Sequence, residues 1–568
     1  MVSIGDIRAW QPDALDAAFD ALTSRQDTLL GLADELDAAR VPPGWSGDAA
    51  SSAASWHGTL AERTRRIVAG VSAVRRAVGE TSDAVVAVGR ALGEAESLAR
   101  FHGFAIGDDS LVSDVHPPVV AAADVDAVAR ERARVQAEII DRLEQILRRA
   151  DDVDADFSGV LGRAARDEID DGSGLSLSGA STAGASAGGL STTEPPPGGT
   201  PADNAGWWAA LSEQEREALI TDKPELLGNL DGLPAEVRDE ANRGRLGDER
   251  ARLEAEAARL QADLDDNLFG GTFTNADAAL DHVNAKLASL DAIEKTLEQG
   301  DRQLLLLDLS QERAQAAVAV GDVGTADHVA VFTPGLGSTV NGSLEGYDDN
   351  MERLRQQAEA ESDRYGDGGS VAAVTWIGYQ APQPGVEGYN PLDSDSVLRD
   401  DSARRGAGDL ADFYRGIDAS RTTDPHLTAL GHSYGSTTTG FAVQQDTGVD
   451  DAVFFGSPGV GTSHIEDLNV PPGHAYRIEA RNDPVADLGA FGIDPSHLDG
   501  MTGLSAREET LPGGRRLAES TGHSDYLTQD STSQYNMSVV VAGQHDRRVQ
   551  DDGRGWGDIG SWPIPGTY

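Results

Sequence analysis

The sequence has no cysteine, which excludes a disulfide framework, a thiol nucleophile and any metal site with cysteine ligands. Lysine is nearly absent as well: Lys223, Lys286 and Lys295 are the only ones, and arginine supplies the other cations. No window approaches about 18 unbroken apolar residues, so we expect no transmembrane helix. Residues 1–10 carry neither the basic nor the apolar region of a Sec signal peptide. We therefore expect a protein that stays in the cytoplasm or is exported by a route without such a signal.

Positive charge is scarce overall, and the formal net charge of the 568-residue chain is −49. So large a negative charge argues against nucleic acid and anionic membrane surfaces as partners, because both would repel it. With 39% hydrophobic and 25% charged residues, the composition is that of a globular protein. The chain is too long for a single core, and we expect about two to four domains.

The strongest local signal lies in residues 426–440. An apolar run at 427–430 is followed by the motif G-H-S-Y-G and then by small residues. This order predicts a strand, a sharp turn and a helix with Ser433 at the apex, which is the layout of a nucleophile elbow. Gly431 and Gly435 are the small neighbours that such a turn needs, and the helix N-terminus favours negative charge developing at Ser433. The alternative is a chance match in a chain with 65 glycines.

Two long helices are predicted over residues 12–40 and 48–100, from leucines and valines at helical spacing. Trp45-Ser46-Gly47 lies in the break between them. This hairpin resembles the WxG-type substrates and partners of type VII secretion, in which Trp and Gly make the turn. The resemblance covers only this segment and implies export and a small helical partner. The alternative is a hairpin that packs within this protein or dimerises. A third helix is predicted over 121–154.

A second set of motifs follows a stretch of low complexity. Residues 172–204 are rich in Gly, Ser, Thr and Ala, with three prolines near the end, and predict a flexible linker. Next come W-W at 207–208, G-N-L-D-G-L-P at 228–234 and A-N-R at 241–243. With the G-H-S-Y-G-S elbow, these motifs resemble an uncharacterised, mainly actinobacterial family of α/β-hydrolases over about residues 205–548. The resemblance implies the α/β-hydrolase fold and leaves the substrate open.

The segment after the linker is expected to be helical. We interpret Trp207 and Trp208 as core anchors and Ser212 with Glu215 as a capping box. Amphipathic helices are predicted over 247–265 and 276–299.

From residue 303 onward, short apolar runs alternate with helical segments. Runs at 304–307 and 316–320 predict a hairpin, and the next runs predict further strands: 328–332, 371–376, 427–430, 452–455 and 474–480. This alternation predicts a mostly parallel sheet with helices on both faces, and its sites should lie at the carboxyl ends of the strands. The expected fold class is α/β, an α/β-hydrolase preceded by an all-α helical hairpin or bundle domain. The expected parts are a helical WxG-like domain (1–160), a linker (161–204), a helical preamble packed on the hydrolase (205–300), the hydrolase domain (301–548) and a tail (549–568).

A serine hydroxyl is a weak nucleophile and needs a base and an acid, which follow it in the order Ser, Asp or Glu, His in this fold. The acid should follow the second strand after the elbow strand. Asp483 lies just past the run 474–480, so it is the predicted acid. Asp487 and Asp494 are the alternatives, as is a loop-capping role for Asp483.

The base should come later in the chain, where His497, His523 and His545 are available. His523 lies in the sequence Gly522-His523-Ser524-Asp525-Tyr526, and the family that the chain resembles places its histidine in the same G-H-S-x-Y context. We predict His523 as the base, with His497 and His545 as alternatives.

An oxyanion hole needs two backbone N–H groups. The predicted donors are Tyr434, directly after the nucleophile, and Gly335 or Leu336 in the loop after the strand 328–332. Residues 333–338 could instead cradle a phosphate, but they lack a Gly-Lys-Ser/Thr ending. His432 is expected to pack beside the elbow. The sequence has neither an H-E-x-x-H helix nor an EF-hand loop, so we expect no metal and no cofactor.

The leading hypothesis is an esterase- or lipase-like serine hydrolase acting by acyl transfer on a small-molecule or lipid ester, through Ser433, Asp483 and His523. One alternative is a type VII secretion-linked effector or partner-binding protein whose helical domain dominates its function. A catalytically inactive scaffold is a third.

Overall fold

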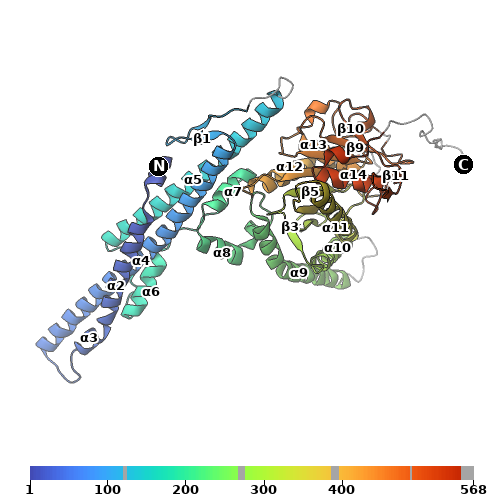
Figure 1. Cartoon of the computed structure of the whole chain (residues 1–568). Helices are drawn as coiled ribbons and strands as arrows, with labels where there is room; N and C mark the ends of the chain where they lie inside the picture. Colours follow the sequence, from blue (N-terminus) through green and yellow to red (C-terminus); the bar gives the residue numbers. More distant parts are fainter. Residues whose placement is uncertain (119–124, 267–274, 386–395, 487–488, 552–568) are drawn as a thin grey trace. The chain divides into compact units, whose positions relative to one another are not determined.

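The structure is a computed structural model that describes residues 1–118, 125–266, 275–385, 396–486 and 489–551 (Figure 1). The chain divides into two compact units. The first comprises residues 1–119, 135–199 and 203–218, and the second comprises 120–134, 200–202 and 219–568. The tryptophans at 207–208 are buried within the first unit, although we expected them in a preamble packed on the hydrolase. Most of the predicted tail, from residue 552 onward, lies outside the described residues.

The first unit is built around the long helix α4 (Asp48–Phe101). Helices α2 (Pro12–Gly31) and α6 (Leu177–Ala187) pack along α4, and the three run side by side in Figure 1. A β1–β2 hairpin also belongs to this unit, so it is mainly helical and not all-α as predicted. The other elements that lie wholly or partly in it are α1 (Ile4–Ala9), α3 (Ala33–Ala38), β1 (Phe104–Ile106), β2 (Val112–Asp114), α5 (Val125–Ala165), α7 (Pro201–Ala209) and α8 (Glu213–Asp222).

Helix α6 lies inside the stretch that the sequence predicts to be a flexible linker. Ser176 caps it by accepting a hydrogen bond from the Gly179 N–H. Its small residues let it approach α4 closely: a Cβ on Gly184 would lie 2.1 Å from the Ala69 carbonyl oxygen. The prediction of a linker was therefore wrong for residues 177–187, because the same composition that suits a loose chain also suits tight helix packing.

The second unit holds an eight-stranded sheet in the order β10-β9-β8-β7-β5-β6-β4-β3. Its strands are β3 (Arg302–Asp308), β4 (Gln315–Val320), β5 (His328–Thr333), β6 (Val371–Ile377), β7 (His426–His432), β8 (Asp451–Phe455), β9 (Ala475–Ile478) and β10 (Thr502–Leu504). The β3–β4 and β4–β6 pairs are antiparallel, and the other pairs are parallel. The predicted N-terminal hairpin and mostly parallel α/β sheet are confirmed. Smaller elements of this unit are β11 (Glu509–Thr510), β12 (Arg516–Leu517), η1 (Pro224–Leu226), η2 (Ile465–Asp467), η3 (Pro495–His497) and η4 (His545–Arg547).

Both faces of this sheet are buried under helices. Val329 and Val331 of β5 pack into a core with α12 (Asp401–Ala419) and α13 (Tyr434–Val443). The alternate residues Ala330 and Phe332 pack into a second core with α11 (Val340–Tyr365) and α14 (Thr532–Val541). Side chains of a strand alternate between faces, so a strand covered on both sides is apolar throughout. Polar chemistry is thereby confined to the ends of the strands.

The preamble motifs hold the outer edge of the sheet. The Asn229 side chain both donates to the Leu307 carbonyl and accepts from the Leu307 N–H, each at 2.8 Å. Asn242 donates to the carbonyls of Gly228 and Leu304 at 2.7 and 3.0 Å. These bonds satisfy the backbone of β3, an edge strand that would otherwise invite pairing with another chain. The G-N-L-D-G and A-N-R motifs are therefore structural.

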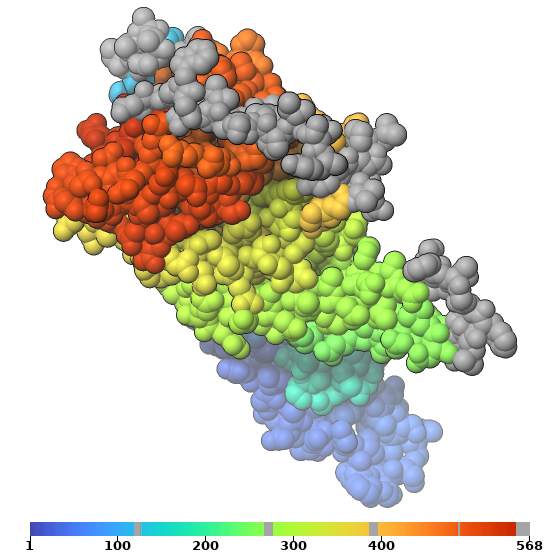
Figure 2. All heavy atoms as spheres, turned by 90° about the vertical axis from the view of Figure 1, so that its right-hand side faces the viewer, coloured from blue at the N-terminus to red at the C-terminus, as the bar shows by residue number. Residues whose placement is uncertain are grey.

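Helices α9 (Ala235–Asp266) and α10 (Asn275–Leu297) pack against the same edge strand. In Figure 2 the described parts of the chain that are coloured from green to red form one continuous surface. Among the described residues, no helix combines the length and the apolar character that a membrane crossing requires.

Candidate active site

The chain turns sharply where β7 meets α13. Ser433 has φ 55° and ψ −132°, a backbone conformation that residues other than glycine rarely adopt. The turn is crowded on both sides: a Cβ on Gly435 would lie 2.3 Å from the Thr333 carbonyl oxygen, and one on Gly431 would lie 2.7 Å from the Ser436 Cα. Space therefore requires both glycines, and the predicted strand, turn and helix are present.

Three predicted site residues meet at the carboxyl ends of the strands. The Ser433 Oγ lies 2.8 Å from Nε2 of His523. The other ring nitrogen of His523, Nδ1, lies 2.9 and 3.0 Å from the two carboxylate oxygens of Asp483. The Asp483 side chain is fully buried, whereas 29% of the His523 side chain is exposed. Nδ1 therefore donates to the carboxylate, and Nε2 is left to accept the proton of the serine hydroxyl.

The carboxylate of Asp483 is held by more than the histidine. The Tyr526 hydroxyl donates to Oδ2 at 2.6 Å, and the Val485 N–H donates to Oδ1 at 3.0 Å. Burial raises the pKa of Asp483, but the hydrogen bonds from His523 and Tyr526 outweigh it, and the pKa lies below its ordinary value. Asp483 is therefore negatively charged over the pH range in which a histidine can accept a proton.

Gly456 makes room for this arrangement. It follows β8 with φ 55°, and a Cβ there would lie 2.9 Å from Oδ2 of Asp483 and 3.2 Å from Cε1 of His523. Any side chain would therefore push on the two partners at once.

His432 packs beside the elbow, as predicted. Its ring stacks on Phe455 with centroids 5.0 Å apart, and its Nε2–H donates to the His523 carbonyl at 2.9 Å. Burial, helped by the neighbouring His523, lowers the pKa of His432 to about 4. His432 is therefore neutral near pH 7 and helps to fix the backbone that carries His523.

The predicted oxyanion donors also meet at the serine. A Cβ on Gly335 would lie 2.8 Å from the Tyr434 nitrogen, so the loop after β5 lies against the start of α13. The Tyr434 N–H is in the first turn of that helix, where no earlier carbonyl of the helix can accept it. The Gly337 N–H donates to the Pro382 carbonyl, and the Ser338 N–H donates to the Gly335 carbonyl within the loop. Within the described part of the chain, the N–H groups of Gly335 and Leu336 have no acceptor.

The alternative acids and bases lie elsewhere. Asp487 falls outside the described residues. Asp494 caps η3 by accepting from the Ser496 N–H, and the His497 side chain is 73% exposed. His545 bonds to Asp451 on a different strand.

Two residues of the site were missed at the sequence level. Tyr526 stands in the same short segment as His523, so its spacing was visible, but nothing in a sequence shows that it reaches Asp483. Gly456 directly follows the predicted strand 452–455, and nothing else in the sequence points to it. The contacts of Tyr526 and Gly456 could not be predicted, because the residues that they contact are distant in the chain.

The amino-acid sequence of this chain is similar to a hydrolase sequence profile and to two mycobacterial proteins. A sequence profile described as alpha/beta hydrolase matches residues 310–493. An uncharacterized protein of Mycobacterium tuberculosis is 39% identical over 238 residues, which cover 40% of this chain and 86% of that protein. A second uncharacterized protein of that species is 28% identical over 396 residues, or 63% of this chain and 58% of that protein.

The solved structures that resemble this chain include an esterase from the archaeon Pyrobaculum calidifontis. The alignment covers 51% of this chain and 97% of the esterase, with 14% sequence identity and a TM-score of 0.28.

Proposed function

Because this chain belongs to the alpha/beta hydrolase family, we propose that it is a serine hydrolase acting on ester-type bonds. Ser433 is the nucleophile, His523 is the general base and Asp483 orients the histidine. The observation that carries the proposal is the unbroken series of hydrogen bonds from Ser433 Oγ through both ring nitrogens of His523 to Asp483.

The reaction follows from these contacts. The Ser433 oxygen attacks the ester carbonyl carbon while its proton passes to Nε2 of His523. The Asp483 carboxylate stabilises the imidazolium that forms. The carbonyl oxygen becomes an oxyanion, and the N–H of Tyr434 with that of Gly335 or Leu336 stabilises it.

The tetrahedral intermediate then collapses. The ester C–O bond breaks, and His523 returns the proton to the leaving alcohol. A water molecule attacks the acyl-enzyme with the same histidine as base, which releases the acid and restores Ser433.

A polar hollow of about 330 Å³ lies beside the elbow helix. Tyr434, the first residue of the elbow helix, contacts two residues that line the hollow, Arg399 and Phe491. The Tyr434 hydroxyl donates to the Arg399 carbonyl, and the Tyr434 ring packs against Phe491. Asp400 and Arg404 place opposite charges in its wall. We therefore expect short or polar esters to be better substrates than long aliphatic ones.

A fluorophosphonate probe tests the proposal directly. It should label the wild-type protein, and Ser433→Ala should abolish the labelling. Ser496→Ala, which removes a serine from η3, should label like the wild type. Turnover of short-chain over long-chain nitrophenyl esters would then establish the preference. Absence of labelling in correctly folded wild-type protein would contradict the enzyme and favour a scaffold.

A second function, partner binding, is favoured by the exposed tryptophans of the first unit. Trp45 and Trp56 are 51% and 67% exposed, and both lie near the α3–α4 turn. We propose a small helical partner for this hairpin, as in type VII secretion. Co-purification of a small helical protein with the wild type, lost in Trp45→Ala and Trp56→Ala, would support it; identical co-purification with both variants would contradict it.

A further inference from the structure

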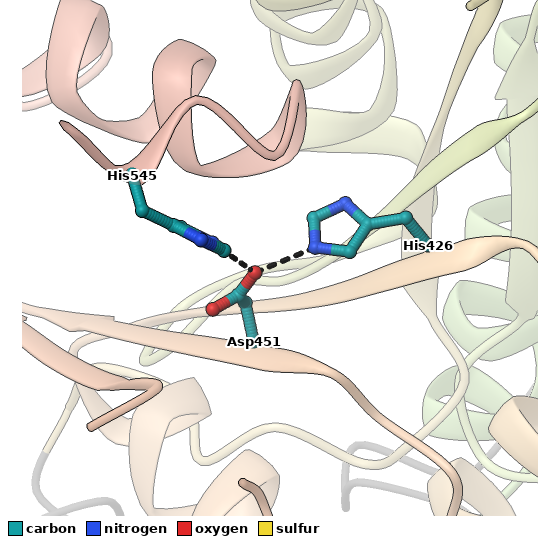
Figure 3. A group of neighbouring side chains, drawn as sticks. All are labelled: His426, Asp451 and His545. Carbon is teal, nitrogen blue, oxygen red and sulfur yellow. Dashed lines mark hydrogen bonds and ion pairs between the residues drawn. The ribbon is translucent and has the colours of Figure 1, made fainter. Parts of the chain in front are cut away.

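Three histidines surround one buried aspartate at the end of the sheet opposite Ser433. Asp451 is the first residue of β8, and His426 is the first residue of β7. His545 begins η4, and His474 directly precedes β9. The Asp451 side chain is fully buried. Figure 3 shows His426 and His545 pointing from opposite sides at the same carboxylate oxygen.

The ring nitrogens lie at contact distance from the carboxylate. His426 Nε2 is 2.6 Å and His545 Nε2 is 2.8 Å from Oδ2 of Asp451, and His474 Nδ1 is 2.7 Å from Oδ1. The ligand atoms of His426, Asp451 and His545 all lie within 4.8 Å of one another. Three separate segments of the chain thus supply one cluster of donors, and His474 holds the other oxygen of Asp451.

His426 requires a positive species at this point. Its Nδ1 lies 3.0 Å from the Val541 carbonyl, so Nδ1 carries a proton and donates it there. In a neutral ring, Nε2 is then a bare lone pair, and it faces a carboxylate oxygen. Two lone pairs at 2.6 Å repel each other unless a proton lies between them or the two groups move slightly apart around a metal ion.

We propose that His426, Asp451 and His545 bind a divalent transition metal ion, with Zn²⁺ as the best fit and a water molecule as a further ligand. Imidazole nitrogens with one carboxylate are a donor set that zinc takes in tetrahedral sites. The bond from His426 Nδ1 to the Val541 carbonyl is the contact that commonly orients a metal-bound histidine.

The fit needs a small adjustment. With zinc–ligand bonds of about 2.0 Å, ligand atoms in a tetrahedral site lie roughly 3.3 Å apart. The nitrogens of His426 and His545 are 2.6 and 2.8 Å from Oδ2, so the rings must withdraw slightly from the carboxylate. Their side chains are 20% and 27% exposed, and they can rotate toward solvent while Asp451 stays in place. The same exposure lets an ion reach the site.

The site would be structural and not catalytic. It lies at the start of β7, whereas Ser433 follows the end of that strand, which corresponds to roughly 20 Å of extended chain. The ion would fasten η4 to the starts of β7 and β8. The sequence predicted no metal, because donors at positions 426, 451 and 545 form none of the short ligand motifs.

Metal content of the intact protein tests the proposal. The full chain is stripped with a chelator, reloaded with Zn²⁺, passed through a desalting column and analysed by mass spectrometry of the elements. We expect about one zinc per chain and a higher melting temperature in the loaded form. Loading with Co²⁺ should give the visible absorption of a four-coordinate nitrogen and oxygen site.

Matched variants separate this site from adventitious binding. Asp451→Asn and His545→Ala should lose the retained zinc and the thermal shift. His497→Ala, which removes one exposed histidine from another part of the fold, should keep both. If Asp451→Asn does not fold, His545→Ala, which changes a partly exposed side chain, decides the question. Wild-type protein without retained zinc, or equal retention in the His545→Ala variant, would overturn the proposal and assign a proton to His426.

Discussion

The Tyr526 hydroxyl donates a 2.6 Å hydrogen bond to Oδ2 of Asp483, on the carboxylate whose oxygens also face His523. The same hydroxyl accepts from the Ala480 N–H at 2.9 Å. Through these two bonds, Tyr526 links the Asp483 carboxylate to Ala480, which lies just after β9. The Tyr526 side chain is almost completely buried.

Removing this hydroxyl should weaken both the fold and the site. We expect Tyr526→Phe to lower the free energy of unfolding by about 1.5–3 kcal/mol, because a hydrogen bond to a charged group is lost and the Ala480 N–H loses its acceptor. The pKa of Asp483 should rise, and kcat should fall by about tenfold with little change in KM. Urea unfolding and ester kinetics measure the two effects. A variant with wild-type kcat would show that the hydroxyl does not position Asp483.

The elbow could be predicted from the sequence because strand, turn and helix are local and leave their signal in adjacent residues. Asp483 and His523 could be proposed because the chain order of the fold restricts the search. The sequence could not show the contacts of Gly456 or of the Asp451 histidines, since each depends on the register of strands far apart in the chain. The error at 177–187 had another cause: small residues fit both a loose linker and a close helix contact.

Gly456→Ala tests whether the space beside Asp483 and His523 matters for the proposed activity. The new Cβ would lie 2.9 Å from Oδ2 of Asp483, and displacing the carboxylate moves His523 with it. We expect kcat for ester hydrolysis to fall by about 100-fold, since small misplacements of catalytic groups have large effects on rate. Stopped assays over a range of substrate concentrations separate kcat from KM.

The control for Gly456→Ala is Gly473→Ala. Gly473 also has a positive φ, 86°, but a Cβ there meets no atom within 4 Å. Both variants therefore carry similar backbone strain, and only Gly456→Ala touches Asp483 and His523. Equal losses of kcat in the two would mean that strain, and not contact with Asp483, causes the effect.

His432 should make stability depend on pH. The pKa of His432 is about 4 in the folded protein and near 6.5 in the unfolded chain. Between these two pH values, the unfolded state binds a proton that the folded state does not bind. The free energy of unfolding should therefore fall as the pH drops from about 6.5 to 4, by at most about 3 kcal/mol, which is the free energy equivalent of this pKa difference. Urea unfolding at pH 7 and pH 4.5 measures the difference.

His432→Phe should remove this part of the pH dependence while keeping the stacking on Phe455. His497→Ala, which deletes an exposed histidine, should retain it. If His432→Phe loses as much stability between the two pH values as the wild type does, the titrating group lies elsewhere.

Gly184→Ala tests the packing of α6 against α4. A Cβ at Gly184 would lie 2.1 Å from the Ala69 carbonyl oxygen, and because that atom is backbone it cannot move aside cheaply. The variant should lower the free energy of unfolding of the first unit by about 1–3 kcal/mol, the usual cost of overpacking. Residues 177–187 should also become sensitive to limited proteolysis, whereas the docked helix of the wild type should resist it.

Gly89→Ala provides the matched comparison. Gly89 lies within α4, and a Cβ there meets no atom within 4 Å. In an open helical position, alanine is more favourable than glycine by up to about 1 kcal/mol, so this variant should be neutral or more stable. A linker that hangs free of α4 would instead be unaffected by Gly184→Ala, and its cleavage rate would be high in the wild type. A loss of stability in Gly184→Ala without a loss in Gly89→Ala thus distinguishes a docked helix from a loose chain of the same composition.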